Sequence, residues 1–273
     1  MSRGAPRSTR FPMGLERLQG EVANASPRDT LRPQRLLREA ALDATRLGRP
    51  TGIGLDSAWV RKRMVDRLRA EGLCGEPVLA AMEAVERHRF IDSALVAQAY
   101  EDTSLPIGHG QTISKPSVIA RMIGLLFEGE SARAQGHLGR VLEIGTGCGY
   151  QAAVLCQLSR DVVSIERLGA LAERARSHLH DLIGRHLHVQ HGDGMLGFAT
   201  RGPYQSIIAA AGGDALPEAW LLQLAPGGRL VAPMRQCGTD GQVLTVVDKL
   251  ADGSTRQRMH DGVLFVPLES GTM

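Results

Sequence analysis

Three glycines, Gly145, Gly147 and Gly149, occupy every second position directly after an apolar run that is typical of a strand. Glycine lacks the Cβ atom that would hold a ligand away from the main chain. In parallel sheets, ligands sit beyond the carboxyl ends of the strands, where the first loop turns into a helix whose amides face the ligand. Glu166 closes the next apolar run, 21 residues after Gly145, where an acid accepts ribose hydroxyls. The pattern predicts a nucleoside-binding loop.

The spacing of the glycines distinguishes between cofactors. Dinucleotide-binding loops have the pattern G-x-G-x-x-G, whereas here the third glycine comes one residue early and Glu143 precedes the loop within the strand. This E-x-G-x-G-x-G pattern resembles the cofactor loop of S-adenosylmethionine-dependent methyltransferases, and it disfavours an NAD-dependent oxidoreductase. Those methyltransferases often place an acid against the adenine amino group after the third strand, where this chain has Asp193 and Gly194. An ordinary Asp-Gly turn is the alternative reading of that pair.

The segment after the fourth expected strand bears on which group is methylated. Methyltransferases that act on an exocyclic amine carry an Asp or Asn, prolines and an aromatic residue there, but residues 209–213 read Ala-Ala-Ala-Gly-Gly. No Pro-Cys pair offers a covalent nucleophile for a pyrimidine carbon. Methyl transfer needs chiefly alignment and exclusion of water, and a carboxylate is already anionic near neutral pH and needs no general base. A carboxylate acceptor is therefore favoured.

The stretch RFIDSALVAQAYEDTSLPIGHGQTISKPSVIARMIGLL (89–126), followed by VLEIGTGCGYQAAVLC, GDGMLG, APGGRLVAPM and GVLFVPL, resembles the protein-L-isoaspartate (D-aspartate) O-methyltransferase family. The likeness covers about Val60 to Leu268 and is most specific in PIGHGQTISKP. It implies methyl transfer to the free α-carboxyl of L-isoaspartyl residues in damaged proteins and peptides. The ester then collapses to a succinimide, and its hydrolysis restores some normal aspartate.

The same resemblance assigns residue roles. It implies that Ser114 is the catalytic residue and that Thr112, Ile113 and His109 contact the substrate. A hydroxyl can donate a hydrogen bond that orients one carboxylate oxygen while the other attacks the methyl group. The alternatives are that Ser114 only caps the helix expected over 114–126, and that His109 is an exposed loop residue. The expected cofactor residues are Glu143, Gly145, Thr146, Gly147, Gly149, Glu166, Arg167, Asp193, Gly194 and Gln242, and Cys148 stands where the family frequently has a serine.

The elements that must position these residues follow from hydrophobic periodicity. Helices are expected over 56–72, 75–90 and 114–126, with a loop over 100–111. After Gly139, short apolar strands (140–145, 161–166, 187–194, 205–212 and 228–234) alternate with helices (150–158, 167–183 and 216–224). Two further strands, 242–250 and 262–268, lack a helix between them, so at least one is antiparallel at a sheet edge. This predicts an α/β fold with a doubly wound, mostly parallel sheet, a Rossmann-like methyltransferase, preceded by an N-terminal helical cap region.

The expected domain organisation has two parts. Residues 1–55, rich in Pro, Gly, Ser and Arg, are expected to form a flexible extension, within which 31–47 has helical spacing and is an alternative docking helix. Residues 56–273 form the methyltransferase domain, with a helical and substrate-loop region over 56–138 and the cofactor-binding α/β core over 139–273. The sequence gives no indication of the oligomeric state.

Composition limits the partners. A net charge of +3 gives no reason to expect a nucleic acid, and the histidines of 178–191 come without a carboxylate-bearing ligand set, so no metal is expected. The cysteines do not form the closely spaced pairs of a zinc or redox site, which predicts a cytoplasmic protein. The sequence has no apolar run long enough to cross a bilayer, so it is not expected to enter a membrane. Isoaspartyl-containing proteins and peptides are the expected substrates. The alternatives are a methyltransferase with a small-molecule or nucleic-acid acceptor, and a non-catalytic cofactor-binding adaptor.

Overall fold

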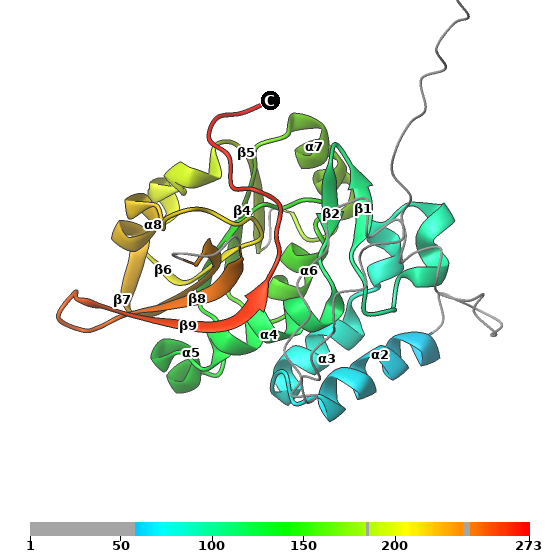
Figure 1. Cartoon of the computed structure of the whole chain (residues 1–273), viewed down its shortest axis with the longest axis horizontal. Coiled ribbons are helices and arrows are strands. Elements are labelled where there is room, and N and C mark those ends of the chain that lie inside the picture. Colours follow the sequence, from blue (N-terminus) through cyan, green and yellow to red (C-terminus); the bar gives the residue numbers. More distant parts are fainter. Residues whose placement is uncertain (1–57, 184–185, 237–240) are drawn as a thin grey trace, which may run out of the picture.

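A computed structural model describes residues 58–183, 186–236 and 241–273, so the predicted extension over 1–55 lies outside the described residues. A seven-stranded sheet runs through the centre in the order β5-β4-β3-β6-β7-β8-β9 (Figure 1). Its strands are β3 (Arg140–Ile144), β4 (Asp161–Glu166), β5 (Leu187–His191), β6 (Tyr204–Ala209), β7 (Leu224–Arg235), β8 (Gln242–Lys249) and β9 (Thr255–Val263). Within these residues, no helix is long and apolar enough to span a bilayer.

The sheet is wound in two directions from β3. The chain runs outward through β4 and β5, then returns to the other side of β3 as β6 and continues to β7, and all four of these pairings are parallel. The strands β8 and β9 complete the sheet in antiparallel pairings. The predicted doubly wound, mostly parallel fold is confirmed. The reversal of direction between β3 and β6 creates the crevice in which such folds bind ligands.

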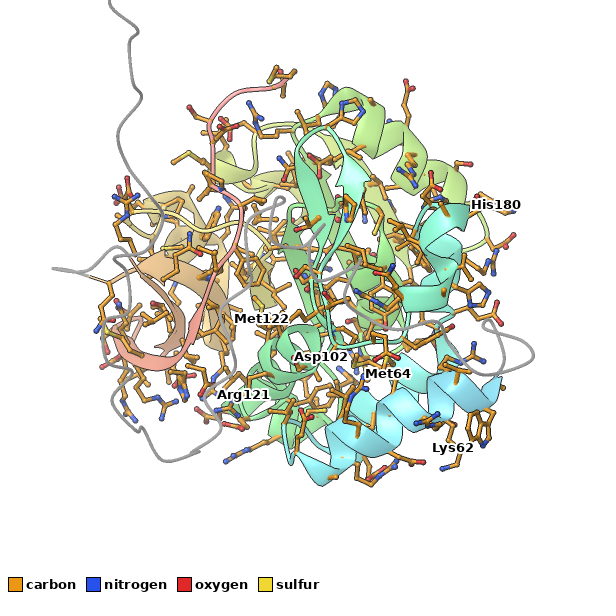
Figure 2. All side chains as sticks on the ribbon, turned by 45° about the vertical axis from the view of Figure 1, so that its right-hand side comes forward. Lys62, Met64, Asp102, Arg121, Met122 and His180 are labelled. Atoms are coloured by element: carbon orange, nitrogen blue, oxygen red, sulfur yellow. The ribbon has the colours of Figure 1, made fainter. Side chains whose placement is uncertain are left out.

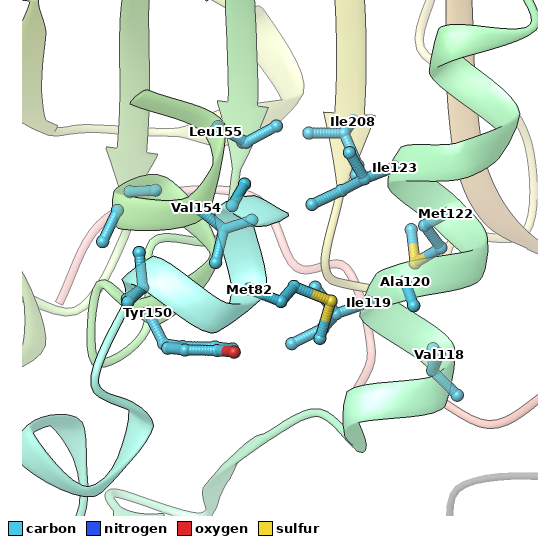
Figure 3. Packing of buried hydrophobic residues seen from close by; sticks show 14 of the residues in the cluster. Met82, Val118, Ile119, Ala120, Met122, Ile123, Tyr150, Val154, Leu155 and Ile208 are labelled. Atoms are coloured by element: carbon cyan, nitrogen blue, oxygen red, sulfur yellow. The ribbon is translucent and has the colours of Figure 1, made fainter. Parts of the chain in front are cut away.

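Helices cover both faces because successive strand residues point to opposite sides. Val141 belongs to one hydrophobic core and Leu142 to the other. The first core is built largely from α2 (Ala58–Ala70), α3 (Glu76–Ala84), α4 (Pro116–Phe127), α6 (Tyr150–Cys156) and α7 (Gly169–His178). Figure 3 shows Met82, Ile119 and Tyr150 converging in it. Ten of the 12 residues of α4 are buried, as expected for a helix enclosed on nearly all sides.

Trp220 anchors the second core, where it lies on α8 (Glu218–Gln223). Its side chain is fully buried, and its Nε1 donates a hydrogen bond to the Gly194 carbonyl over 2.8 Å.

We expect Trp220→Ala to lower the free energy of unfolding by about 3–5 kcal/mol, because it leaves a large cavity, as measured by denaturant unfolding. The control is Trp59→Ala, since Trp59 is 62% exposed and its loss should change stability by less than about 0.5 kcal/mol. Similar losses for both variants would contradict the packing role.

Two predicted elements differ from the structure, and one short helix was not predicted. The expected loop over 100–111 contains a strand, β1 (Leu105–Gly108), which pairs with β2 (Gln111–Ile113) as a hairpin. Its turn has positive φ at Gly108, His109 and Gly110. The segment was predicted as a loop because glycine and proline are typical of loops. The last strand is β9, so the expected strand over 262–268 is largely a segment that crosses the end of the sheet. A short helix, α5 (Glu130–Gln135), was not predicted.

The start of α4 also differs from the prediction. The N-cap residue is Lys115, and α4 begins at Pro116, so the alternative in which Ser114 caps this helix is wrong. Proline fits the first helical turn because its missing N–H needs no acceptor there. The capping role falls to Asp102, whose carboxylate accepts the Ser117 amide over 2.8 Å and the Ser117 hydroxyl over 2.7 Å. Ser114 thus lies before the helix, with its hydroxyl not used as a cap.

Candidate active site

A cavity lies beyond the carboxyl ends of β3, β4 and β6, at the reversal point of the sheet. One side is formed by the glycine loop and the end of β4. Another part of the wall is formed by residues 111–114, which include β2 and Ser114, and residues 266–269 complete the wall. Segments that are far apart in the sequence therefore meet at one site. Of the predicted site residues, those that line the cavity are Thr112, Ile113, Ser114, Gly145, Thr146, Gly147, Glu166, Arg167 and Gly194.

The glycines of the loop have different tasks. All three have positive φ: +87° at Gly145, +56° at Gly147 and +94° at Gly149. A Cβ atom at Gly147 would meet one neighbour within 4 Å, the Ile107 Cδ1 atom at 3.3 Å, so the main chain here borders the cavity. At Gly149 a Cβ atom would come within 2.7 Å of the Leu179 Cδ1 atom. Gly149 is thus required for close packing of α6 and is not among the lining residues.

Glu166 joins the glycine loop to the end of β4. Its Oε2 accepts the Gly147 amide over 2.8 Å, and its Oε1 accepts the Leu168 amide over 3.0 Å. The side chain is buried, yet it lines the cavity. A carboxylate has about four acceptor sites, so two amide donors leave room for two hydroxyl donors. This geometry suits a ribose diol.

Glu143 lies behind the loop rather than in the cavity wall. Its carboxyl is fully buried and accepts the Ser164 hydroxyl, which in turn bonds with the Thr146 hydroxyl. Its Oε1 has no hydrogen-bond partner within the described residues. Burial raises the pKa of Glu143 to about 8, although the hydrogen bond from Ser164 acts in the other direction and lowers it. Glu143 is therefore placed to hold Thr146 from behind through Ser164.

This raised pKa makes stability depend on pH. Between about 4.5 and about 8, the folded state keeps a proton on Glu143 that the unfolded chain releases, so rising pH lowers the free energy of unfolding through this window. Relative to Glu143→Gln, which cannot titrate, wild type should lose about 1.4 kcal/mol per pH unit there. Urea unfolding from pH 5 to 9 measures this difference. The exposed Glu173→Gln variant is the control; a constant difference between wild type and Glu143→Gln would contradict the buried protonated carboxyl.

The segment after β9 closes the side of the cavity next to β4 and β5. Glu269 pairs with Arg167 over 2.8 Å, and Gly271 donates its amide to Oδ2 of Asp193 over 2.7 Å. Oδ1 of Asp193 accepts the Met195 amide. Met273 donates its amide to the Arg167 carbonyl. Asp193 is therefore held just outside the lining residues, while its neighbour Gly194 lines the cavity.

Besides Glu143, Gly149 and Asp193, two further predicted residues, His109 and Gln242, do not line the cavity. His109 is exposed at the tip of the β1–β2 hairpin with φ of +52°. Gln242 binds the main chain of Phe265: its Oε1 accepts the amide over 2.7 Å, and its Nε2 donates to the carbonyl over 3.2 Å. Gln242 thus holds the segment that supplies Val266 and Leu268 to the cavity.

Histidines and acids do not gather into a metal site within the described residues. His178 bonds with the Cys148 carbonyl, His188 pairs with Asp161, and His191 bonds with the Arg167 carbonyl. Each of these histidines thus has a structural partner on a strand or loop of the domain.

Several residues that line the cavity were not predicted from the sequence. The apolar lining residues Ile107, Ile119 and Leu268, together with Gln151, were not predicted. Ile107 and Ile119 flank the motif that contains Ser114, and the β1–β2 pairing and the first turns of α4 would have identified them. Gln151 follows the glycine loop by two residues, and its Nε2 is buried with no hydrogen-bond partner in the described part of the chain.

Comparison with known proteins agrees with this arrangement. A protein-L-isoaspartate O-methyltransferase of Methylibium petroleiphilum is 53% identical over 272 residues, covering 100% of both chains. One of Leptothrix cholodnii is 54% identical, covering 98% of this chain and 96% of the relative. A solved protein-L-isoaspartate O-methyltransferase superposes with a TM-score of 0.68 at 26% identity, covering 77% of this chain and 66% of its own.

A second solved structure supports the fold alone, because it is 22% identical. It is a candidate protein-L-isoaspartate O-methyltransferase from Plasmodium falciparum in complex with S-adenosyl-L-homocysteine, with a TM-score of 0.65 over 77% of this chain and 98% of its own. The family model for protein-L-isoaspartate(D-aspartate) O-methyltransferase matches residues 60–273. With that match and with relatives above 50% identity along the whole chain, this protein belongs to the protein-L-isoaspartate(D-aspartate) O-methyltransferase family.

Proposed function

We propose that this protein transfers the methyl group of S-adenosylmethionine to the free α-carboxyl of L-isoaspartyl residues in damaged proteins and peptides, and so initiates their repair through a succinimide. One observation carries the proposal: the glycine loop with Glu166 and the segment with Ser114 line a single cavity. The family match supports the same reaction. A nucleoside cofactor and a carboxylate acceptor can therefore meet there.

The residues of the cavity fit this cofactor. Main chain borders the cavity at Gly147, and the Glu166 carboxylate has acceptor sites left for ribose hydroxyls. Among the described lining residues the one basic side chain, Arg167, is paired with Glu269. A phosphate would find no unpaired cation, whereas an adenosyl sulfonium requires none. We assign the adenine end to Gly194 and its neighbour Asp193, and the ribose to Glu166.

When bound, S-adenosylmethionine supplies an electrophilic methyl group on sulfur. The chain's own task is to align the acceptor and to exclude water. The hydroxyl of Ser114 is proposed to donate a hydrogen bond to one oxygen of the isoaspartyl carboxylate, so that the other oxygen faces the methyl carbon. Ile107, Ile113 and Ile119 line the cavity beside it and keep it apolar. Thr112 and His109 are assigned to the peptide around the isoaspartyl residue.

The test is methyl transfer from labelled S-adenosylmethionine to two peptides that differ in one linkage. The first has an L-isoaspartyl residue, and the second has a normal aspartyl residue in the same sequence. We expect a base-labile methyl ester on the first peptide and at least about 100-fold less on the second, because only the isoaspartyl linkage presents a free α-carboxyl. A base-stable methyl product, or equal transfer to both peptides, would contradict the proposal.

We further propose that the enzyme acts in the cytoplasm on isoaspartyl-containing proteins, without a nucleic-acid or membrane partner. Cys74, Cys148 and Cys156 are free thiols, which suits a reducing compartment. Fractionation of cells that express the chain, with detection in the soluble cytoplasmic fraction, would support this location. Recovery with membranes or in an extracytoplasmic fraction would contradict it.

A further inference from the structure

A buried arginine lies directly behind the proposed catalytic segment. Arg87 opens the short 3-10 helix Arg87–Phe90 that follows α3, and its side chain is fully buried. No acidic side chain forms an ion pair with it among the residues that the structure describes. An arginine side chain does not lose its charge in proteins, and a buried cation is costly unless hydrogen bonds compensate it. The position therefore needs an explanation.

The guanidinium group joins two chain segments that are distant in sequence. Its Nε donates to the Ala99 carbonyl over 2.8 Å, and its Nη2 donates to the Ser114 carbonyl over 2.7 Å. Its Cζ lies 4.9 Å from the centroid of the Tyr150 ring, and Tyr150 lines the cavity. Its Nη1 is buried without a hydrogen-bond partner in the described residues. Charge-assisted bonds of this kind are about twice as strong as neutral ones.

The other side of the same segment is held by Asp102. Its carboxylate accepts the amide and the hydroxyl of Ser117, at the first turn of α4. Asp102 is half-buried, whereas Lys62 projects from α2 at the surface (Figure 2). The chain from Ser114 to Ser117 is thus fixed at one end by a buried cation and at the other by a carboxylate. The hydroxyl of Ser114 takes part in neither contact, so it is left for the cavity that Ser114 lines.

We propose that Arg87 is a positioning residue for methyl transfer: its bond to the Ser114 carbonyl fixes the main chain of Ser114, and thereby the direction of the hydroxyl toward the acceptor carboxylate. The proposal rests on the proposed function, because it deepens the role assigned to Ser114. Arg87 is not among the lining residues of the cavity, so it acts through Ser114 and does not touch substrate or cofactor. A displacement of about 1 Å at such a residue can reduce the rate about 100-fold.

The test compares Arg87→Lys and Arg87→Met with Arg89→Met, a matched control in the same short helix whose side chain is 57% exposed. For Arg87→Met we expect kcat for the isoaspartyl peptide to fall at least about 10-fold, with the Kd for S-adenosylhomocysteine within about twofold of wild type. For Arg87→Lys we expect an intermediate loss, since an ammonium keeps the charge but not the two-pronged geometry. Arg89→Met should match wild type.

A second readout does not depend on activity. Hydrogen–deuterium exchange of the amides in residues 111–119 should be at least about 10-fold faster in both Arg87 variants, while residues 140–150 should be unchanged. If Arg87→Met fails to fold, the exchange and kcat of Arg87→Lys test the proposal. The proposal is overturned if exchange in 111–119 is unchanged, or if kcat per folded molecule equals wild type. A wild-type enzyme that does not methylate the isoaspartyl peptide defeats the proposed function instead, and the exchange measurement still shows whether Arg87 holds the segment.

Discussion

Replacing Glu166 with alanine is expected to weaken cofactor binding at least about 100-fold. The substitution removes the acceptor of the Gly147 and Leu168 amides and, in the proposed complex, the acceptor of the ribose hydroxyls. Hydrogen bonds to a charged group contribute about 1.5–3 kcal/mol each, and two of them correspond to a factor of 100 or more. Calorimetric titration with S-adenosylhomocysteine measures the effect.

Two further variants make this test specific. Glu166→Gln keeps the shape but turns an NH2 group toward one of the two amides, so we expect about a 10-fold loss. Glu173→Ala removes an exposed acid on α7 and should bind like wild type. If Glu166→Ala binds S-adenosylhomocysteine as tightly as wild type, Glu166 does not bind the ribose, whatever the effect of the substitution on stability.

Ser114→Ala is expected to lower kcat about 100-fold while leaving the Kd for S-adenosylhomocysteine within about twofold. In the proposed complex the hydroxyl orients the acceptor, whereas the nucleoside is held by other lining residues, Gly147 and Glu166. Misorientation of reacting groups reduces the rate without a matching loss of affinity. Steady-state kinetics with the isoaspartyl peptide, at saturating cofactor, measure kcat and KM separately.

The control for this prediction is Ser177→Ala, since Ser177 is exposed on α7 and its loss should leave both constants unchanged. A drop in cofactor affinity that equals the drop in kcat would show that Ser114 serves binding instead. Because Ser114 is not the N-cap of α4, the substitution should change the melting temperature by no more than about 2 °C.

The sequence predicted the α/β core well because its signals are local. Apolar runs of five or six residues between glycine loops identified β3, β4 and β6, since strands buried on both faces need such runs. The glycine loop and Glu166 were also predicted correctly as neighbours, because a fixed spacing in a strand-loop-helix unit brings them together. The structure links them through the hydrogen bond from the Gly147 amide to Glu166.

Other parts depend on contacts between distant segments, which no local pattern encodes. Gly149 reads as a cofactor glycine, but Leu179 occupies the space that a side chain there would need. Gln242 holds Phe265, and Asp193 accepts the amide of Gly271. Arg87 stands in the charged run Glu86-Arg87-His88-Arg89, which looks like a solvated surface, yet it is buried because Ala99 and Ser114 supply carbonyls across the fold. Sequence spacing cannot show such partners.

The most direct test is a crystal structure of the enzyme with S-adenosylhomocysteine and an isoaspartyl peptide. We expect the ribose on Glu166, the sulfur directed toward residues 112–114, and the α-carboxyl of the isoaspartyl residue within hydrogen-bond distance of the Ser114 hydroxyl. A nucleoside bound away from Glu166, or a peptide whose α-carboxyl lies remote from Ser114, would contradict the account.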